Sequence, residues 1–298
     1  MFIGTSSWKY RGWCGTIYDA NRYLWRNKFA EKRFEKDCLK EYAEVFKTVC
    51  VDGAYYRFPD QRYLEGLISQ VPSDFQFGFK VTDEITVKRF NNLPRFGIRA
   101  GTQNDNFLNA DLFATAFLAP CEPFRAHIGL IMFEFSHFYS SDFIQGRDFV
   151  AMLDSFLEKI PRGWPYGVEI RNKHFLHPEY FAVLKKHRVA AIYNSWTAMP
   201  SVLEQIEMPE SFTHDELCGA RFLLKPGRDY QEAVDLFSPY ESIKEHYEEG
   251  RNAGARLVQH GLVYYPRRKT YVYVNNRFEG NAIGTIVAML EKALHAER

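Results

Sequence analysis

Short apolar segments alternate with helix-like segments along nearly the whole chain, and this alternation limits the folds that the sequence can adopt. Expected strands cover residues 2–5, 49–52, 75–80, 128–134, 166–172, 190–194, 220–225 and 270–275. Helical spacing of apolar residues covers residues 37–47, 60–70, 107–118, 149–160, 178–187, 232–252 and 282–293. Strands that alternate with helices are expected to run parallel, and eight of them predict a closed barrel. The expected fold class is α/β, with a single TIM-like (β/α)8 barrel domain over residues 1–298 and long loops after the first and third strands.

Composition places the chain among ordinary globular proteins and argues against several functional classes. The 298 residues are 46% hydrophobic and 25% charged, and the formal net charge is +1. So small a net charge provides no global field that would attract nucleic acid or an anionic membrane. The five cysteines are scattered without a C-x-x-C pair, which argues against a disulfide framework and a zinc site. No signal peptide and no apolar run long enough to span a membrane is visible, so we expect a cytoplasmic protein.

Charged and amide side chains stand at the carboxyl ends of the expected strands, where the active sites of parallel barrels lie. The polar set comprises Asp52, Lys80, Glu134, Glu169, Arg171, Asn194, Lys225 and Asn275. Aromatic residues that could cover a ligand are Trp8, Tyr55, Tyr56, Trp196 and Tyr273. Polar groups flanked by aromatic faces suit a sugar or another small polar ring. Apart from the two glutamates, these residues are the expected substrate-binding set, although each aromatic side chain could instead pack the loops onto the barrel.

Glu169 and Arg171 lie on one face of the strand at 166–172, because side chains alternate along a strand. Opposite charges on a short apolar strand are costly to bury unless they are paired. Glu134 ends the preceding strand, so both carboxyl groups could reach one substrate. An acid and a base need pKa values that are pushed apart, which a cation beside one carboxyl group can provide. We therefore predict Glu134 and Glu169 as catalytic residues, with Arg171 keeping Glu169 ionised; a structural ion pair that closes the barrel is the alternative.

Motifs for metal binding, nucleophilic catalysis, phosphate binding and nucleic-acid binding are weak or absent in the sequence. His174 and His177 lie three residues apart but in an expected loop, and H-E-x-x-H is absent, so we predict no metal site. The G-x-S-x-G motif and the glycine-rich phosphate loops are also absent, and no cofactor is identified. Acidic residues interrupt the basic run at 22–36, which we interpret as a solvated helix face and not as a nucleic-acid site. A small polar molecule is the expected partner, and the oligomeric state is open.

Several short motifs together point to one family. They are Gly4-Thr-Ser-Ser-Trp8, Tyr55-Tyr-Arg57 before Pro59, Lys80 with Thr86, Glu169-Ile-Arg171 and Val274-Asn-Asn276. With these motifs the chain resembles, over nearly its whole length, the proteins of the domain of unknown function DUF72, also called YecE-like. The resemblance implies a TIM-like barrel and no established activity.

The chain also departs from the usual pattern of that family. Asp52, Glu134 and Asn172 stand where the family commonly has Asn, Gln and His, and Val87 follows Thr86 in place of a second His. The segment Arg221-Phe-Leu-Leu-Lys225 replaces an Arg-x-His-Gly sequence. An altered substrate, altered chemistry or loss of catalysis would each be consistent with these departures.

The sequence therefore predicts an enzyme that uses general acid/base catalysis on a small polar, carbohydrate-like substrate. Hydrolysis and isomerisation are not separated by these residues. The alternative is a barrel that binds a metabolite or nucleic acid without turning it over. Carboxyl groups of Glu134 and Glu169 more than about 10 Å apart would favour that alternative, because glycosidase carboxyls lie closer.

Overall fold

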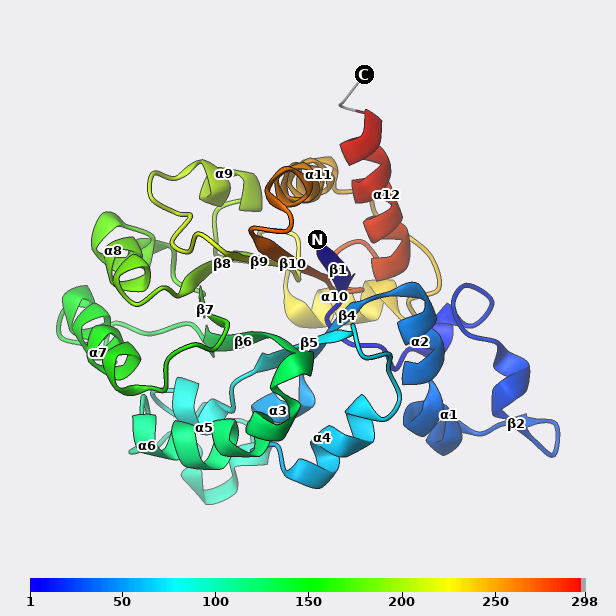
Figure 1. Ribbon diagram of the computed structural model, residues 1–298, viewed down its shortest axis with the longest axis horizontal. Coiled ribbons are helices and arrows are strands. Elements are labelled where there is room, and N and C mark those ends of the chain that lie inside the picture. Colours follow the sequence, from blue (N-terminus) through cyan, green and yellow to red (C-terminus); the bar gives the residue numbers. More distant parts are fainter. Residues whose placement is uncertain (296–298) are drawn as a thin grey trace.

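The computed structural model describes residues 1–295 and contains a closed barrel of eight parallel strands in the order β1, β10, β9, β8, β7, β6, β5 and β4. The strands are β1 (Phe2–Thr5), β4 (Thr48–Val51), β5 (Gln76–Lys80), β6 (Ile128–Phe135), β7 (Tyr166–Ile170), β8 (Ala190–Ser195), β9 (Leu217–Phe222) and β10 (Lys269–Val274). Figure 1 shows the strands at the centre of the molecule, with helices around them. The predicted α/β, TIM-like barrel is therefore confirmed.

Helices form the outer layer of the barrel. The longer ones are α4 (Gln61–Ile68), α7 (Gly146–Lys159), α8 (Pro178–Lys186), α10 (Tyr230–Phe237), α11 (Glu248–Tyr264) and α12 (Ala282–His295). Shorter helices are α1 (Glu31–Asp37), α2 (Leu39–Val45), α3 (Gly53–Tyr56), α5 (Asp83–Thr86), α6 (Ala110–Leu112) and α9 (Val202–Glu207). Within residues 1–295, no helix combines the length and the apolar character that a membrane crossing requires.

Two of the predicted helices are divided. The segment 232–252 contains the end of α10 and the start of α11, because Pro239 lies between them and proline cannot continue a helix. The segment 107–118 contains α6 and then a π-helical turn at Phe113–Leu118. The alternation of strands and helices is unchanged by these differences.

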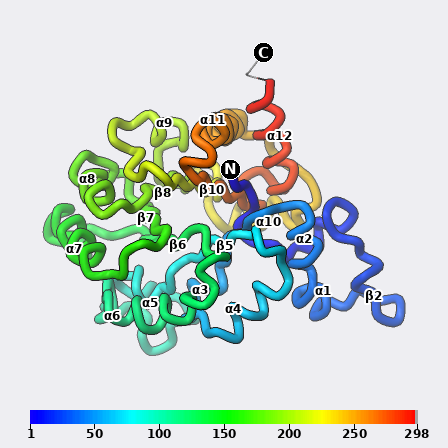
Figure 2. Tube along the Cα trace, viewed as in Figure 1, coloured from blue at the N-terminus to red at the C-terminus, as the bar shows by residue number. Residues whose placement is uncertain are grey.

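The long connection after β1 contains an antiparallel hairpin of β2 (Leu24–Trp25) and β3 (Lys28–Phe29). Arg26 and Asn27 turn the hairpin with positive φ angles of 50° and 61°, as a two-residue turn between twisted strands requires. Figure 2 shows this hairpin projecting from the body of the molecule. The basic run at 22–36 therefore lies on the hairpin and α1, and not on one continuous helix face as predicted.

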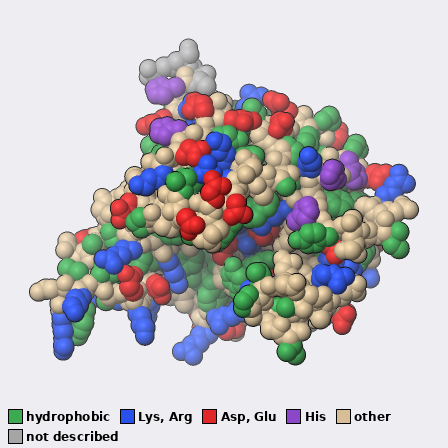
Figure 3. Space-filling view, turned by 180° about the vertical axis from the view of Figure 1, so that it is seen from behind, with side chains coloured by type: hydrophobic (Ala, Val, Ile, Leu, Met, Phe, Trp, Pro, Cys, Tyr) green, Lys and Arg blue, Asp and Glu red, His purple; other side chains and the backbone are tan. Residues whose placement is uncertain are grey.

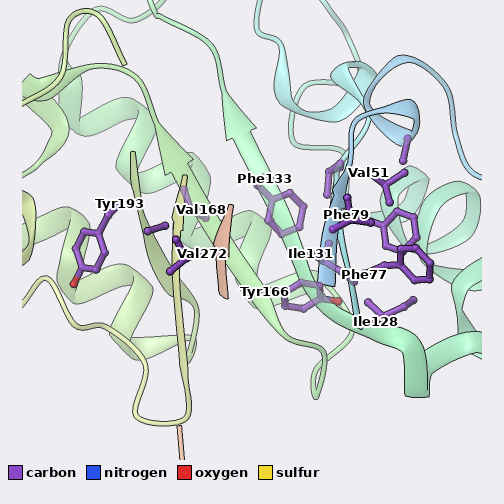
Figure 4. Close-up of a cluster of buried hydrophobic side chains, with 14 of the residues drawn as sticks. Val51, Phe77, Phe79, Ile128, Ile131, Phe133, Tyr166, Val168, Tyr193 and Val272 are labelled. Atoms are coloured by element: carbon purple, nitrogen blue, oxygen red, sulfur yellow. The ribbon is translucent and has the colours of Figure 1, made fainter. Parts of the chain in front are cut away.

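Large inward-facing side chains fill the barrel interior opposite glycines. A Cβ atom on Gly78 would lie 2.3 Å from the Tyr273 hydroxyl, and one on Gly167 would lie 2.5 Å from Cδ1 of Ile192. Phenylalanines of β5 face outward, as the alternation predicts, and pack in the core between barrel and helices. Figure 4 shows Phe77 and Phe79 among the buried apolar side chains of this core. The inner face of β5 is thereby left to Gly78 and Lys80.

Strand β9 begins three residues before the predicted segment 220–225. Its first residue, Leu217, pairs with Lys269 of β10, and its last, Phe222, pairs with Val274. Leu217 packs inside the barrel, so alternation also places Gly219 and Arg221 on the inner face. The shift moves Lys225 beyond the strand and brings Arg221 into the barrel.

Candidate functional site

Six charged side chains meet at the carboxyl end of the barrel, and we call them the mouth cluster: Asp52, Lys80, Glu134, Glu169, Arg171 and Arg221. Each follows an inward-facing residue of its strand by an even number of positions, so its side chain points to the same side. Cys50 precedes Asp52 in this way, and Met132 precedes Glu134. Glu134 and Glu169 are directly paired across β6 and β7. The parallel order of the strands therefore brings three cations and three anions to the same end of the barrel.

Arg221 is the centre of the mouth cluster. Its Nη1 lies 2.5 Å from Oε2 of Glu134 and 2.6 Å from Oε2 of Glu169, and its Nη2 lies 3.9 Å from Asp52. Burial alone would lower the pKa of Arg221, but Glu169 and Glu134 raise it well above its ordinary value. Because one nitrogen bridges both glutamates, their carboxyl groups are separated by no more than about two hydrogen-bond lengths.

Glu134 contacts all three cations of the cluster. Its Oε1 lies 2.9 Å from Arg171, and its Oε2 lies 2.9 Å from Lys80 as well as beside Arg221. Burial alone would raise the pKa of Glu134, but Arg171, Lys80 and Arg221 together hold it well below its ordinary value. Glu134 is therefore a carboxylate at neutral pH and is a poor proton donor there.

Arg171 and Lys80 connect the charged network to aromatic rings. The Arg171 guanidinium lies 3.8 Å from the centre of the Trp196 ring, and Lys80 Nζ lies 4.1 Å from the centre of the Tyr55 ring. Arg171 also bonds Glu169 at 3.2 Å, and its side chain is 12% exposed. Stacking of a cation on an aromatic face stabilises it where water is partly excluded. The two rings thus fix the directions of both cations.

Some polar atoms at the mouth have no hydrogen-bond partner among the described residues. They include Oδ1 of Asn194 and Nε of Arg221, both of which are buried. Oδ1 of Asp52 also lacks a hydrogen bond, but it lies 3.5 Å from Nζ of Lys80. The Asn194 amide nitrogen donates to the Ile170 carbonyl, so only its oxygen is free. The Asp52 side chain as a whole is 35% exposed, which leaves its other oxygen open to solvent. Unpaired buried polar atoms are costly, so such a group is a reason to look for a ligand.

The remaining predicted residues are placed differently. Asn275 uses its side-chain oxygen to accept from the backbone N–H of Arg277, and Lys225 pairs with Glu245 at 2.7 Å outside the mouth cluster. Tyr56 is 62% exposed beside Arg95, and Trp8 lines a separate cleft of about 360 Å³ next to α4. None of these contacts involves a charged residue of the mouth cluster.

The structure corrects the prediction for Tyr273. This side chain is completely buried, and its hydroxyl lies 3.1 Å from Oγ1 of Thr48 at the start of β4. The inward position on β10 directs the ring down the barrel axis against Gly78, and not upward to the mouth. Tyr273 therefore packs the interior of the barrel, away from the mouth.

Arg221 is the residue that sequence reasoning missed. The expected strand at 220–225 starts three residues later than β9, which places Lys225 and not Arg221 at the predicted strand end. The alternation of Leu217, Gly219 and Arg221 would have identified the inner face if the strand had been started at residue 217. Within residues 1–295, no group of three His, Cys, Asp or Glu side chains is arranged to hold a metal ion.

Comparisons with known proteins agree with this architecture. The family model described as "Protein of unknown function DUF72" matches residues 2–298. A DUF72 family protein from Thermotoga maritima superposes with a TM-score of 0.62 at 18% identity, covering 100% of this chain and 99% of that one. A DUF72 family protein from Enterococcus faecalis gives a TM-score of 0.62 at 16% identity in one crystal structure, covering 98% and 95%. A second crystal structure of it gives 0.61 at 17% identity, covering 97% and 96%. At such identities the likeness shows the fold alone, and no curated protein sequence matches this chain.

Proposed function

The chain belongs to the DUF72 family of proteins of unknown function, and from this membership and the mouth cluster we propose that the barrel mouth binds a small polar molecule. The observation that carries the proposal is the position of Arg171. Its guanidinium is held between the Trp196 ring and the two glutamates, and it is still partly exposed. Because the Arg171 side chain is already held in place, its N–H groups can donate to a ligand without the entropy cost of ordering the side chain on binding.

The chemistry of the mouth favours a ligand with both hydrogen-bond donors and acceptors. Asp52 and the free oxygen of Asn194 can accept from hydroxyl groups, and Arg171 can donate to an oxygen of the ligand. The signs of the mouth cluster balance, with three cations against three anions. A cluster without excess positive charge does not favour the phosphate backbone of a nucleic acid. On the face shown in Figure 3, which is opposite to that of Figure 1, acidic and basic side chains are also interspersed. A sugar or another polyhydroxylated metabolite fits these groups best.

Acid/base catalysis is the second candidate, and the bridging of Glu134 and Glu169 by one nitrogen favours it. Two carboxyl groups this close can address the same bond of a substrate. Glu134 contacts three cations, which keep it ionised, and Glu169 contacts two, Arg171 and Arg221. In this candidate Glu134 stabilises positive charge, and Glu169 carries the proton transfer.

A screen of metabolites and glycosides by thermal shift tests the binding proposal. Asp52→Asn removes the partly exposed carboxylate of the mouth and should weaken any hit by about tenfold, because a bond to a charged group is lost. Asp74→Asn is the matched control, since Asp74 is exposed and pairs with Lys47 away from the mouth. Equal affinities of a hit for the parent, Asp52→Asn and Asp74→Asn would rule out the mouth as its site.

Turnover of a confirmed ligand then tests the catalytic candidate. Glu169→Gln should retain binding and reduce the turnover rate by roughly 10²–10⁴, the usual contribution of a proton-transfer group. Turnover by Glu169→Gln at the parent rate would remove acid/base catalysis while leaving the binding proposal intact.

A further inference from the structure

A cavity of about 650 Å³ lies at the amino-terminal end of the barrel. Its wall includes the first residues of four strands, Ile128 of β6, Tyr166 of β7, Leu217 of β9 and Lys269 of β10. Because the strands are parallel, this end is opposite to the mouth cluster. Small-molecule cavities typically have about 300–1,000 Å³, so the volume suits a metabolite.

Basic side chains dominate the rim of this cavity. It contains six Lys or Arg side chains and one Glu. Lys186 and Arg188 are paired with Asp154 and Glu216. Arg162, Arg267 and Lys269 have no acidic group within ion-pairing distance among residues 1–295. Positive charge is therefore in excess around the cavity.

Cations at this end of a barrel can interact favourably with the carboxyl ends of the surrounding helices, which carry partial negative charge. Lys186 is the last residue of α8, where such a cation is expected, although its Nζ bonds Asp154. Arg162 and Arg267 lie in the connections beyond the ends of α7 and α11, and Lys269 begins β10. These three cations are therefore outside the last helical turns.

Apolar residues form the inner part of the cavity. Leu157, Ile160 and Val189 belong to its wall, with Gly129 at the barrel end. Behind Gly129, inside the barrel, the buried Tyr271 ring closes this end, since a Cβ atom on Gly129 would lie 2.5 Å from the Tyr271 hydroxyl.

We propose that this cavity binds a small organic anion that has an apolar body and a phosphate or carboxylate group. The anionic group meets Arg162, Arg267 and Lys269, since cations without partners favour a charged acceptor. The body lies on the aliphatic wall, where its burial contributes further affinity. This site is separate from the proposed site at the mouth.

Fluorescence titration with anilinonaphthalene sulfonate, an apolar aromatic anion, tests the proposal on the full chain. The parent should bind the probe. A double variant, Arg162→Gln with Lys269→Gln, should weaken binding about tenfold or more through the loss of charge-assisted bonds. The matched control is Lys159→Gln with Lys185→Gln. It removes the same charge from the carboxyl ends of α7 and α8, but neither residue lines this cavity.

Competition identifies the source of the anionic group. Displacement of the probe by decanoate alone assigns the site to acyl carboxylates, and displacement by adenosine monophosphate alone assigns it to organic phosphates. Displacement by both assigns it to amphipathic anions in general. No probe binding by the parent, equal binding by both double variants, or no displacement by either competitor would overturn the proposal.

Discussion

Replacement of Arg221 by methionine is expected to destabilise the protein strongly and in a pH-dependent way. The buried guanidinium bonds Glu134 and Glu169 through one nitrogen, at 2.5 and 2.6 Å. Methionine retains much of the apolar stem but leaves both carboxylates without their shared donor. Removing one partner from a buried ionic network costs about 3–5 kcal/mol of the free energy of unfolding. We expect a loss of this size at a pH of about 7.

The sign of the pH dependence follows from the pKa of Glu134. In the parent, nearby cations lower this pKa, so the contribution of Glu134 to stability is present above its unfolded pKa and is lost as the pH falls through its folded pKa. In Arg221→Met the two carboxylates repel each other, and protonation of one relieves the repulsion. The stability difference between parent and variant should therefore shrink as the pH falls from about 7 to about 5.5.

Urea denaturation followed by tryptophan fluorescence measures both quantities. Arg188→Gln is the control, because its pair with Glu216 is exposed on both sides and exposed pairs contribute little. The double variant Arg221→Met with Glu169→Gln should recover part of the loss, since one unpaired charge is removed. A loss in Arg221→Met no larger than in Arg188→Gln, or one unchanged at the lower pH, would refute the assigned role of Arg221.

Four further outcomes are expected. Gly78→Ala should cost about 1–3 kcal/mol of the free energy of unfolding, because the new Cβ would lie 2.3 Å from the Tyr273 hydroxyl. In Gly66→Ala the new Cβ in α4 meets nothing within 4 Å, so this variant should be more stable than the parent by about 0.5–1 kcal/mol. Equal effects of Gly78→Ala and Gly66→Ala in urea denaturation would contradict the close contact between Gly78 and Tyr273. Tyr42→Phe should cost about 1–3 kcal/mol in the same assay, because the hydroxyl accepts from the backbone N–H of Thr5, and a loss near zero would argue against that bond. Ellman's reagent should modify Cys14 first in the native protein, since the other four thiols are buried, and rapid reaction of several thiols would contradict this.

The fold could be predicted from the sequence because local patterns encode it. The alternation of strand and helix segments determines a parallel barrel, and the period of two in strand 75–80 correctly separates the outward phenylalanines from Gly78 and Lys80. Glu134 and Glu169 could be placed on neighbouring strands for the same reason, and their cross-strand pairing agrees. The sequence also indicated that Arg171 would meet Glu169, since residues two apart share one face of a strand.

Tertiary structure alone decided which charges meet and which side chains only pack. The start of β9 is determined by its pairing with β10 and β8, so Arg221 enters the barrel and Lys225 does not. The direction of the Tyr273 ring depends on the space above Gly78, which lies on a strand far away in the sequence. The pKa of Glu134 depends on three cations from three other strands or strand ends, and these distances are absent from any local pattern. Strand phase is a local property of the chain, whereas the register between strands and the space that side chains share arise only when the barrel closes.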